Sequence, residues 1–366
     1  MTSSKRLVGP DVTRAVALIC VVVLNYHGYL NGSRAVAGPS ASLPQRLFDP
    51  WTGVLSTRFA ATFMLVAGVG VSLMTSRSRA SGDRAAIAVV RWRLVRRGML
   101  LYAGGFVLDW IWPGTILFFY GAAFVLAAFV FTLRTRWLIV IGCAVAAAAA
   151  GLHGWVAARA ADGDPATWLT SPQTLVTESP RGLVLDTFVN GTHPLLPWFA
   201  FMCLGMIVGR SLDAMRPLRW AAYGAVATAV TYLVNHIATS GRADDRVFVT
   251  AMSTRPFDRG LLYTIGTAGT ALAAFCVISV VAETQRNSGF VHVLSRAGQM
   301  TLSLYMLHVL VFNFIVHWLH WVGGTGLDTA LMFALVFWVL AIAVASWWRR
   351  LIGLGPLESL YRRFGG

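Results

Sequence analysis

Long apolar runs alternate with short polar segments along almost the whole chain. A run of about 20 residues is long enough to cross a hydrocarbon core of roughly 30 Å as a helix. Ten such runs can be marked, at residues 13–31, 54–75, 97–113, 115–133, 137–158, 194–211, 219–239, 262–282, 299–320 and 329–348. The pattern predicts an all-α fold, a polytopic membrane helix bundle of about ten transmembrane helices.

Composition and charge support this class of protein. Hydrophobic residues make up 57% of the chain and charged residues 12%, with a mean hydropathy of +0.65. If the N-terminus is cytoplasmic, 21 of the 30 Lys and Arg residues fall on the cytoplasmic side and 9 on the outer side. This asymmetry follows the positive-inside rule and predicts that both termini are cytoplasmic. It accounts for the net charge of +15, so nucleic-acid binding is not needed to explain it.

The chain shows no internal repeat and no long hydrophilic stretch, so a single integral membrane domain over 1–366 is expected. Residues 76–97 are interpreted as a basic cytoplasmic loop and residues 160–193 as a long outer loop. The four cysteines all lie in apolar runs and are interpreted as core packing. No cluster has the spacing of a zinc site, so no metal is expected.

The first apolar run is entered through Asp11 and Arg14 and left through Asn25 and His27. At 100° per residue, Asn25 lies about 20° from Arg14, so Asp11, Arg14 and Asn25 share one helical face. His27 lies about 220° from Arg14 and could turn to that face only if the helix loosened near Gly28. The acid–arginine pair is either an interfacial anchor or one end of a binding site, roughly 16–20 Å from the Asn-Tyr-His cluster.

Ionisable residues inside spans are costly and usually mark function. Asp109 lies near the outer end of the third run, His193 just before the sixth, and His308 near the middle of the ninth. Arg58, at the outer end of the second run, either snorkels or binds an anion. His308 is either functional or a buried histidine bonded to a tyrosine or a backbone carbonyl.

In chain order, several segments resemble the YeiB-like family of bacterial membrane proteins. That family is related to the transmembrane acyltransferases that include heparan-α-glucosaminide N-acetyltransferase. The segments that carry the resemblance are residues 11–15 leading to Asn25, 58–59 before 68–70, 116–121, 194–210, 295–308 and the Gly-Pro-Leu-Glu of 355–358.

The resemblance implies transfer of an acyl group from cytoplasmic acyl-CoA, with acetyl-CoA the first candidate, to an acceptor on the far side. By position, Arg14 would belong to the donor end and Asn25 to the membrane-embedded site. The acceptor would be an envelope sugar or a lipid-linked glycan, and the protein would be a multi-pass protein of the inner membrane.

The polar residues can be given roles in this reaction. His27 or His193 would deprotonate the acceptor or accept the acyl group first, Asn25 would bind the thioester carbonyl, and Asp109 would fix the tautomer of the base. Four further residues are expected to hold the donor with Arg14: Asp11, Arg58, Arg96 and Arg97. His308 is kept as an additional catalytic candidate.

The alternative is a small-molecule or lipid transporter, or a flippase, whose pathway is lined by the same polar stripe. His308 near the middle of the membrane favours it, whereas the lack of an internal repeat is against it. A scaffold role is a third alternative, which polar residues in at least four spans disfavour. Membrane lipids and the acceptor are the expected partners, and a homo-oligomer is left open.

Overall fold

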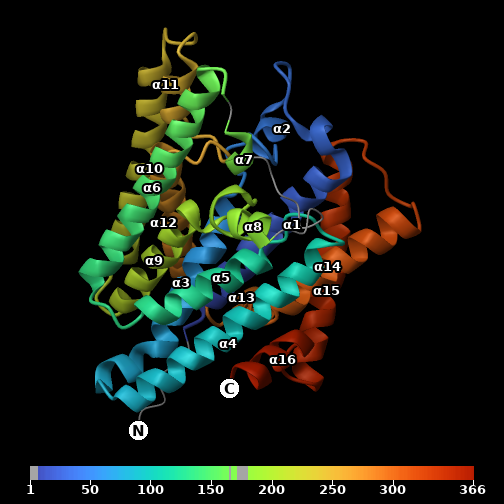
Figure 1. The fold of residues 1–366 in the computed structure, drawn as a ribbon. Helices are drawn as coiled ribbons and strands as arrows, with labels where there is room; N and C mark the ends of the chain where they lie inside the picture. Colours follow the sequence, from blue (N-terminus) through green and yellow to red (C-terminus); the bar gives the residue numbers. More distant parts are fainter. Residues whose placement is uncertain (1–6, 165, 171–179) are drawn as a thin grey trace. The chain divides into compact units, whose positions relative to one another are not determined.

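All regular secondary structure in the described residues is helical (Figure 1). The computed structural model describes residues 7–164, 166–170 and 180–366. These divide into two compact units, and each is described by itself. Unit 1 comprises residues 1–63, 216–223 and 271–360, and unit 2 comprises residues 64–215, 224–270 and 361–366. The single membrane domain expected from the sequence stays a prediction.

Unit 1 is organised around its first helix. Helix α1 (Gly9–Asn31) packs against α13 (Gly289–Gly298), α14 (Thr301–Phe312) and α15 (Leu327–Leu351). The unit also holds η1 (Gly32–Ala35), α2 (Leu43–Leu47), the end of α12 (Leu261–Thr284), η4 (Asn313–Trp318) and the start of α16 (Pro356–Gly365). Glycine permits the closest approach, because a Cβ at Gly298 would lie 1.8 Å from the carbonyl oxygen of Asp11.

Unit 2 contains two closely packed helix pairs. Helix α4 (Arg84–Asp109) packs on α5 (Leu117–Val130), and α6 (Thr135–Ala161) packs on α9 (Leu195–Ser211). A Cβ at Gly121 would lie 2.4 Å from the backbone nitrogen of Tyr102, so the α4–α5 contact needs glycine. The other elements are α3 (Arg58–Ser81), α7 (Thr167–Thr170), α8 (Pro180–Leu185), η3 (Asp186–Asn190), α10 (Pro217–Thr239) and α11 (Arg246–Ala251).

Six helices in the described residues are long and apolar enough to cross a membrane. They are α1 with η1, α3, α6, α12, α14 with η4, and α15. The segments Arg181–Asn190 and Leu195–Ser211, bent by 55°, make a seventh if they form one span. The chain is therefore a multi-pass membrane protein by composition. The ten predicted runs all lie on helices, but the count of ten and the sidedness of the termini stay predictions, since α4, α5 and α10 do not meet the same criteria.

The basic segment 76–97 is helical where the sequence analysis expected a loop. Helix α3 continues to Ser81, and α4 begins at Arg84 after a turn at Gly82, whose φ is +66°. Asp83 caps α4, because its carboxylate accepts hydrogen bonds from the backbone nitrogens of Ala85 (2.9 Å) and Ala86 (3.3 Å). Two residues thus make the turn. The predicted outer loop 160–193 lies partly outside the described residues, and its described end contains α7, α8 and η3.

Candidate functional site

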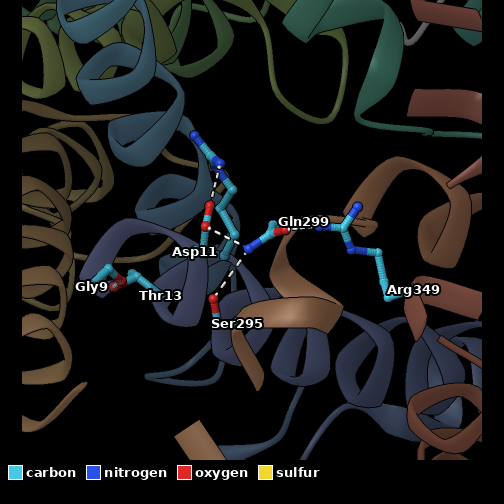
Figure 2. A network of polar contacts seen from close by, with 7 residues as sticks. Gly9, Asp11, Thr13, Ser295, Gln299 and Arg349 are labelled. Atoms are coloured by element: carbon cyan, nitrogen blue, oxygen red, sulfur yellow. Dashed lines mark hydrogen bonds and ion pairs between the residues drawn. The ribbon is translucent and has the colours of Figure 1, made fainter. Parts of the chain in front are cut away.

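A polar network surrounds Asp11 at the beginning of α1 (Figure 2). Asp11 is buried, and its Oδ1 accepts a hydrogen bond of 3.1 Å from Arg14 Nη1. Its Oδ2 accepts one of 3.1 Å from Gln299 Nε2, which also donates to Ser295 Oγ at 3.3 Å. The Oε1 atom of Gln299 accepts from Arg349 Nη2 on α15. The network therefore ties three helices of unit 1 together.

The chemistry of the partners fixes the orientation of the Gln299 amide. A carboxylate can only accept and a guanidinium can only donate, so the amide nitrogen must face Asp11 and the oxygen must face Arg349. Arg14 pairs with Asp11 on the same helix, three residues away, and its side chain remains 29% exposed. The pair thus anchors one end of the helix while the Arg14 guanidinium still reaches solvent.

A cavity of about 230 Å³ opens beside Asp11. Its charged or titratable lining residues are Asp11, Arg286 and His292, and Ser295 adds a hydroxyl. The charges of Asp11 and Arg286 are both paired, with Arg14 and Glu283 respectively, and the His292 and Ser295 side chains complete the polar lining.

Asn25 lies farther along the same face of α1 and meets His308 on α14. The two side chains approach at 3.4 Å between Asn25 Nδ2 and His308 Nε2. His308 Nδ1 contacts the carbonyl oxygen of Tyr305, which can only accept, so Nδ1 carries the proton and Nε2 is the acceptor. Asn25 must then donate to His308. The amide has a second N–H, which a ligand oxygen could accept.

Tyr26 also contacts His308, through a backbone carbonyl group. Its hydroxyl donates to the carbonyl oxygen of His308 at 3.1 Å, and its ring stacks on Phe333 at 4.5 Å between centroids. Both Tyr26 and His308 are buried, whereas Asn25 is partly exposed. A substrate would therefore reach the Asn25 amide before the imidazole.

The Gly-Pro-Leu-Glu segment near the end of the chain caps the helix that carries His308. The Glu358 carboxylate accepts hydrogen bonds from the backbone nitrogens of Leu302 (2.8 Å) and Ser303 (3.1 Å) and from Ser303 Oγ (2.5 Å). A Cβ at Gly355 would lie 2.0 Å from Glu358 Oε2, so the motif needs glycine there. Negative charge is favoured at a helix N-terminus, and here it fixes the start of α14.

His27 does not join the Asp11 and Asn25 face. Helix α1 continues to Asn31, so the condition under which His27 could turn to that face, a loosening near Gly28, is not met. The buried imidazole is held instead by the following loop, since His27 Nδ1 lies 2.9 Å from the carbonyl oxygen of Phe48. The carbonyl requires the proton on Nδ1, which leaves Nε2 as the basic nitrogen.

Asp49 organises the loop that holds His27. Its carboxylate accepts from the backbone nitrogens of Ala37 (2.9 Å), Trp51 (2.7 Å) and Thr52 (2.9 Å), and from Thr52 Oγ1 (2.6 Å). Burial raises the pKa of Asp49, but these hydrogen bonds outweigh burial and hold the pKa below its usual value. Arg58, another residue of the predicted donor set, is buried at the start of α3.

In unit 2, Asp109 and His193 are connected through one turn. Asp109 Oδ1 accepts from Gly114 N at 2.7 Å, and the Gly114 carbonyl oxygen accepts from Thr192 Oγ1 at 3.1 Å. His193 Nδ1 lies 2.9 Å from the same hydroxyl. Because that hydroxyl has already donated its single proton, His193 Nδ1 donates to it and Nε2 is the basic nitrogen. Asp109 thus supports this histidine indirectly, through Gly114 and Thr192.

Arg259 fixes the segment that precedes His193. It is buried, and its guanidinium donates to the carbonyl oxygens of Val189, Asn190 and Gly191 at the end of η3. Burial lowers the pKa of Arg259 to about 10, so it stays charged at neutral pH. A cation at a helical C-terminus is favourable, and this one holds the turn in place.

The predicted donor residues Arg96 and Arg97 lie on α4. Arg97 Nη1 contacts Met74 Sδ at 3.0 Å, and the Arg97 guanidinium lies 5.1 Å from the centroid of the Tyr361 ring. Within the described residues, no group of three or more His, Cys, Asp or Glu could hold a metal ion.

Sequence reasoning missed Gln299, Arg349, Thr192 and Arg259. Gln299 and Arg349 lie at the ends of apolar runs and were not among the ionisable residues considered inside them. Thr192 and Arg259 were interpreted as loop residues. A signal did exist for Gln299, because it is the first residue of the ninth run and is polar, and Asp11 likewise lies near the start of the first run. The contact between them could not be inferred from that position alone.

Two family models match the chain. The one described as heparan-alpha-glucosaminide N-acetyltransferase, catalytic, matches residues 6–248, more than half of the chain. The one described as protein of unknown function (DUF418) matches residues 211–365. A search of curated proteins finds no match. The first match includes Asp11, Asn25 and His193, and the second includes His308 and Glu358, so together they confirm the resemblance predicted from the sequence.

Proposed function

The chain belongs to the heparan-α-glucosaminide N-acetyltransferase catalytic family, and on that premise we propose that it is a membrane-bound acyltransferase. The donor is a cytoplasmic acyl-CoA, with acetyl-CoA the first candidate. The acceptor is a sugar or a lipid-linked glycan of the envelope, and the plasma membrane is the site of action.

The observation that carries the proposal is the orientation of Asn25 by His308. One amide N–H donates to His308 Nε2, so the other is held in a fixed direction at the partly exposed side of the pair. A thioester oxygen bound there would gain a hydrogen bond as it becomes negative. Preorganised donors of this kind contribute about 10²–10³-fold to acyl transfer.

The proposed reaction needs one base. A histidine takes the proton of the acceptor hydroxyl or amine, the new acyl–oxygen or acyl–nitrogen bond forms, and the carbon–sulfur bond breaks. The thiolate of CoA leaves and is then protonated. We keep His27 and His193 as the candidates for this base, since Nδ1 of each donates to a neighbouring oxygen and Nε2 does not carry the proton in that tautomer. Asp109 would support His193 as a positioning residue through Thr192.

The donor's anionic part would lie near the beginning of α1. Arg286 and His292 line the cavity beside Asp11, and Arg14 pairs with Asp11 from three residues farther along α1. We keep Arg58, Arg96 and Arg97 as further predicted donor contacts. In this arrangement Asp11 acts by holding Arg14 and by fixing α1 against α13.

The test is acyl transfer by the purified full chain in lipid nanodiscs, with labelled acetyl-CoA and an extract of envelope glycans and glycolipids. We expect Asn25→Ala to lower transfer by about 10²–10³-fold and His308→Gln to lower it by a comparable factor. Asn313→Ala is the matched control, since this amide follows α14 and bonds the carbonyl of Val309.

Two results would overturn the proposal. One is a wild-type protein that neither hydrolyses acetyl-CoA nor labels any acceptor. The other is proton-coupled solute uptake in proteoliposomes that survives both His27→Ala and His193→Ala, which is the behaviour of a transporter.

A further inference from the structure

Three arginines lie close together on α4. Arg93, Arg96 and Arg97 are spaced three and four residues apart, so their side chains are neighbours. Among the described residues, the buried Nε atom of each has no hydrogen-bond partner. An unpaired buried donor is unfavourable, and three side by side indicate a function.

Nearby arginines show what ordinary anchoring looks like. Arg91, on the same helix, donates from Nε to the carbonyl oxygen of Ala128 at 3.0 Å. Arg210 donates from Nη1 and Nη2 to the carbonyl oxygens of Leu133 and Phe131, each at 2.8 Å, although its buried Nε also has no partner among the described residues. Arg91 therefore shows that a carbonyl oxygen can satisfy an arginine Nε on this helix, whereas the Nε atoms of Arg93, Arg96 and Arg97 have no such acceptor.

The last residues of the chain add another positive charge. Arg93 and Arg362 both lie close enough to Arg97 to repel its charge. Tyr361 lies against the Arg97 guanidinium, and a Cβ at Gly365 would lie 2.5 Å from Arg97 Nε. None of the ion pairs found within the described residues supplies a carboxylate to this group. Four guanidinium groups thus gather beside the last residues of the described chain, where a Cβ at Gly366 would lie 2.7 Å from Arg96 Nη2 and 4.0 Å from Arg93 Nε.

We propose that Arg93, Arg96, Arg97 and Arg362 form a binding site for a phosphate-bearing anion, a phosphomonoester or a diphosphate. The planar fork of arginine matches phosphate oxygens, and the charge-assisted bonds would satisfy the buried donors. Two sources carry this chemistry, the phosphates of a CoA thioester and the headgroup of an anionic lipid. The proposal rests on the proposed function only for the first of these sources.

The experiment measures binding to the full chain in nanodiscs of neutral phosphatidylcholine, with inorganic pyrophosphate and CoA as probes. We expect Arg96→Gln/Arg97→Gln to weaken binding by at least about tenfold, since bonds to charged groups are the strong ones. Arg84→Gln is the matched control, because Arg84 is an exposed arginine in the first turn of the same helix. It lies roughly 20 Å from Arg97, beyond the screening length at physiological salt, so binding should stay within about twofold of wild type.

Two further variants guard against misfolding. Arg96→Lys/Arg97→Lys keeps the charge and loses the fork, so it should bind more weakly than wild type and more tightly than the glutamine pair. Arg362→Gln changes an exposed residue and should also weaken binding. Equal binding by wild type, Arg84→Gln and the glutamine pair would overturn the proposal, as would no binding of any probe and no preference for anionic lipid.

Two comparisons separate the sources. A preference for CoA over dephospho-CoA in neutral lipid identifies the nucleotide. A rise in melting temperature with phosphatidylglycerol that the glutamine pair lacks identifies the lipid headgroup. A short acetyl thioester without phosphates separates this proposal from the acyl-transfer proposal, because its turnover tests the Asn25 centre alone. Turnover without phosphate binding would reject the arginine site and leave the acyltransferase standing.

Discussion

The tightest contact between α1 and α13 predicts a strong effect of one methyl group. In Gly298→Ala the new Cβ would lie 1.8 Å from the carbonyl oxygen of Asp11 and 2.6 Å from its carbonyl carbon. Both atoms belong to the backbone, so no side-chain rotation can make room. The two helices would have to separate by about 1.5 Å to restore ordinary contact, which is overpacking of the costly kind.

That separation would also stretch the hydrogen bond between Gln299 Nε2 and Asp11 Oδ2, which is 3.1 Å long. Overpacking costs about 1–3 kcal/mol, and a weakened bond to a charged group adds to that cost. We expect the free energy of unfolding to fall by about 2–4 kcal/mol. Acyl transfer should fall as well, because Asp11 holds Arg14.

Gly289→Ala is the matched control in the same helix. Gly289 is the first residue of α13, and a Cβ there would meet nothing within 4 Å. Alanine should stabilise this position by about 0.5–1 kcal/mol, because glycine loses more conformational freedom on folding. The two substitutions add the same atom to one helix and should change stability in opposite directions.

The measurement is reversible denaturant unfolding in mixed micelles, followed by tryptophan fluorescence, with acyl transfer measured on the same preparations. A Gly298→Ala protein within 0.5 kcal/mol of wild type would refute the reasoning. So would equal destabilisation by both variants, since that would show that α13 tolerates no change and that the Asp11 contact is not special.

Three other outcomes are expected. The pKa of Asp49 is lowered in the folded protein, so the stability that its carboxylate contributes is complete above the ordinary carboxyl pKa and is lost as pH falls through the folded pKa. In Asp49→Asn the free energy of unfolding should therefore depend less on pH when acid unfolding is monitored by circular dichroism. A pH dependence equal to that of wild type would contradict this prediction. Glu358→Gln should destabilise the chain by about 1–2 kcal/mol in denaturant unfolding and lower acyl transfer, whereas wild-type values for both would argue against its capping of α14. Thr192→Val removes the acceptor of His193 Nδ1 and should lower kcat and alter its pH profile, while Thr192→Ser restores both; identical profiles for all three proteins would exclude His193 as the base.

The shared face of α1 was predictable because helical periodicity is a local property. Asp11 and Asn25 were placed on one face by their spacing, and the structure directs both toward one stretch of chain, where Asp11 meets Gln299 and Asn25 meets His308. The same geometry placed His27 elsewhere, and that was correct. The helix does not loosen near Gly28, and Phe48 supplies a partner for His27 without any break in the helix.

The partners themselves were not predictable from one sequence. Asp11 and Gln299 lie 288 positions apart, and Thr192 and Gly114 lie 78 apart. No local pattern encodes such pairings, because they depend on which helices pack together. The helical structure of the basic segment 76–97 was not predicted for a related reason. Its charge suggested a loop, but Gly82 and the Asp83 cap complete the turn in two residues, which leaves the arginines on helices.

The cap on α14 has a consequence for the order in which the protein is made. Glu358 follows its partners Leu302 and Ser303 by 56 and 55 positions, so the ribosome delivers the helix with His308 well before the carboxylate that secures its first turn. Until the Gly-Pro-Leu-Glu segment has been synthesised, the backbone nitrogens of Leu302 and Ser303 lack this acceptor, so the cap of the first turn of α14 forms only after all of α15 has been made.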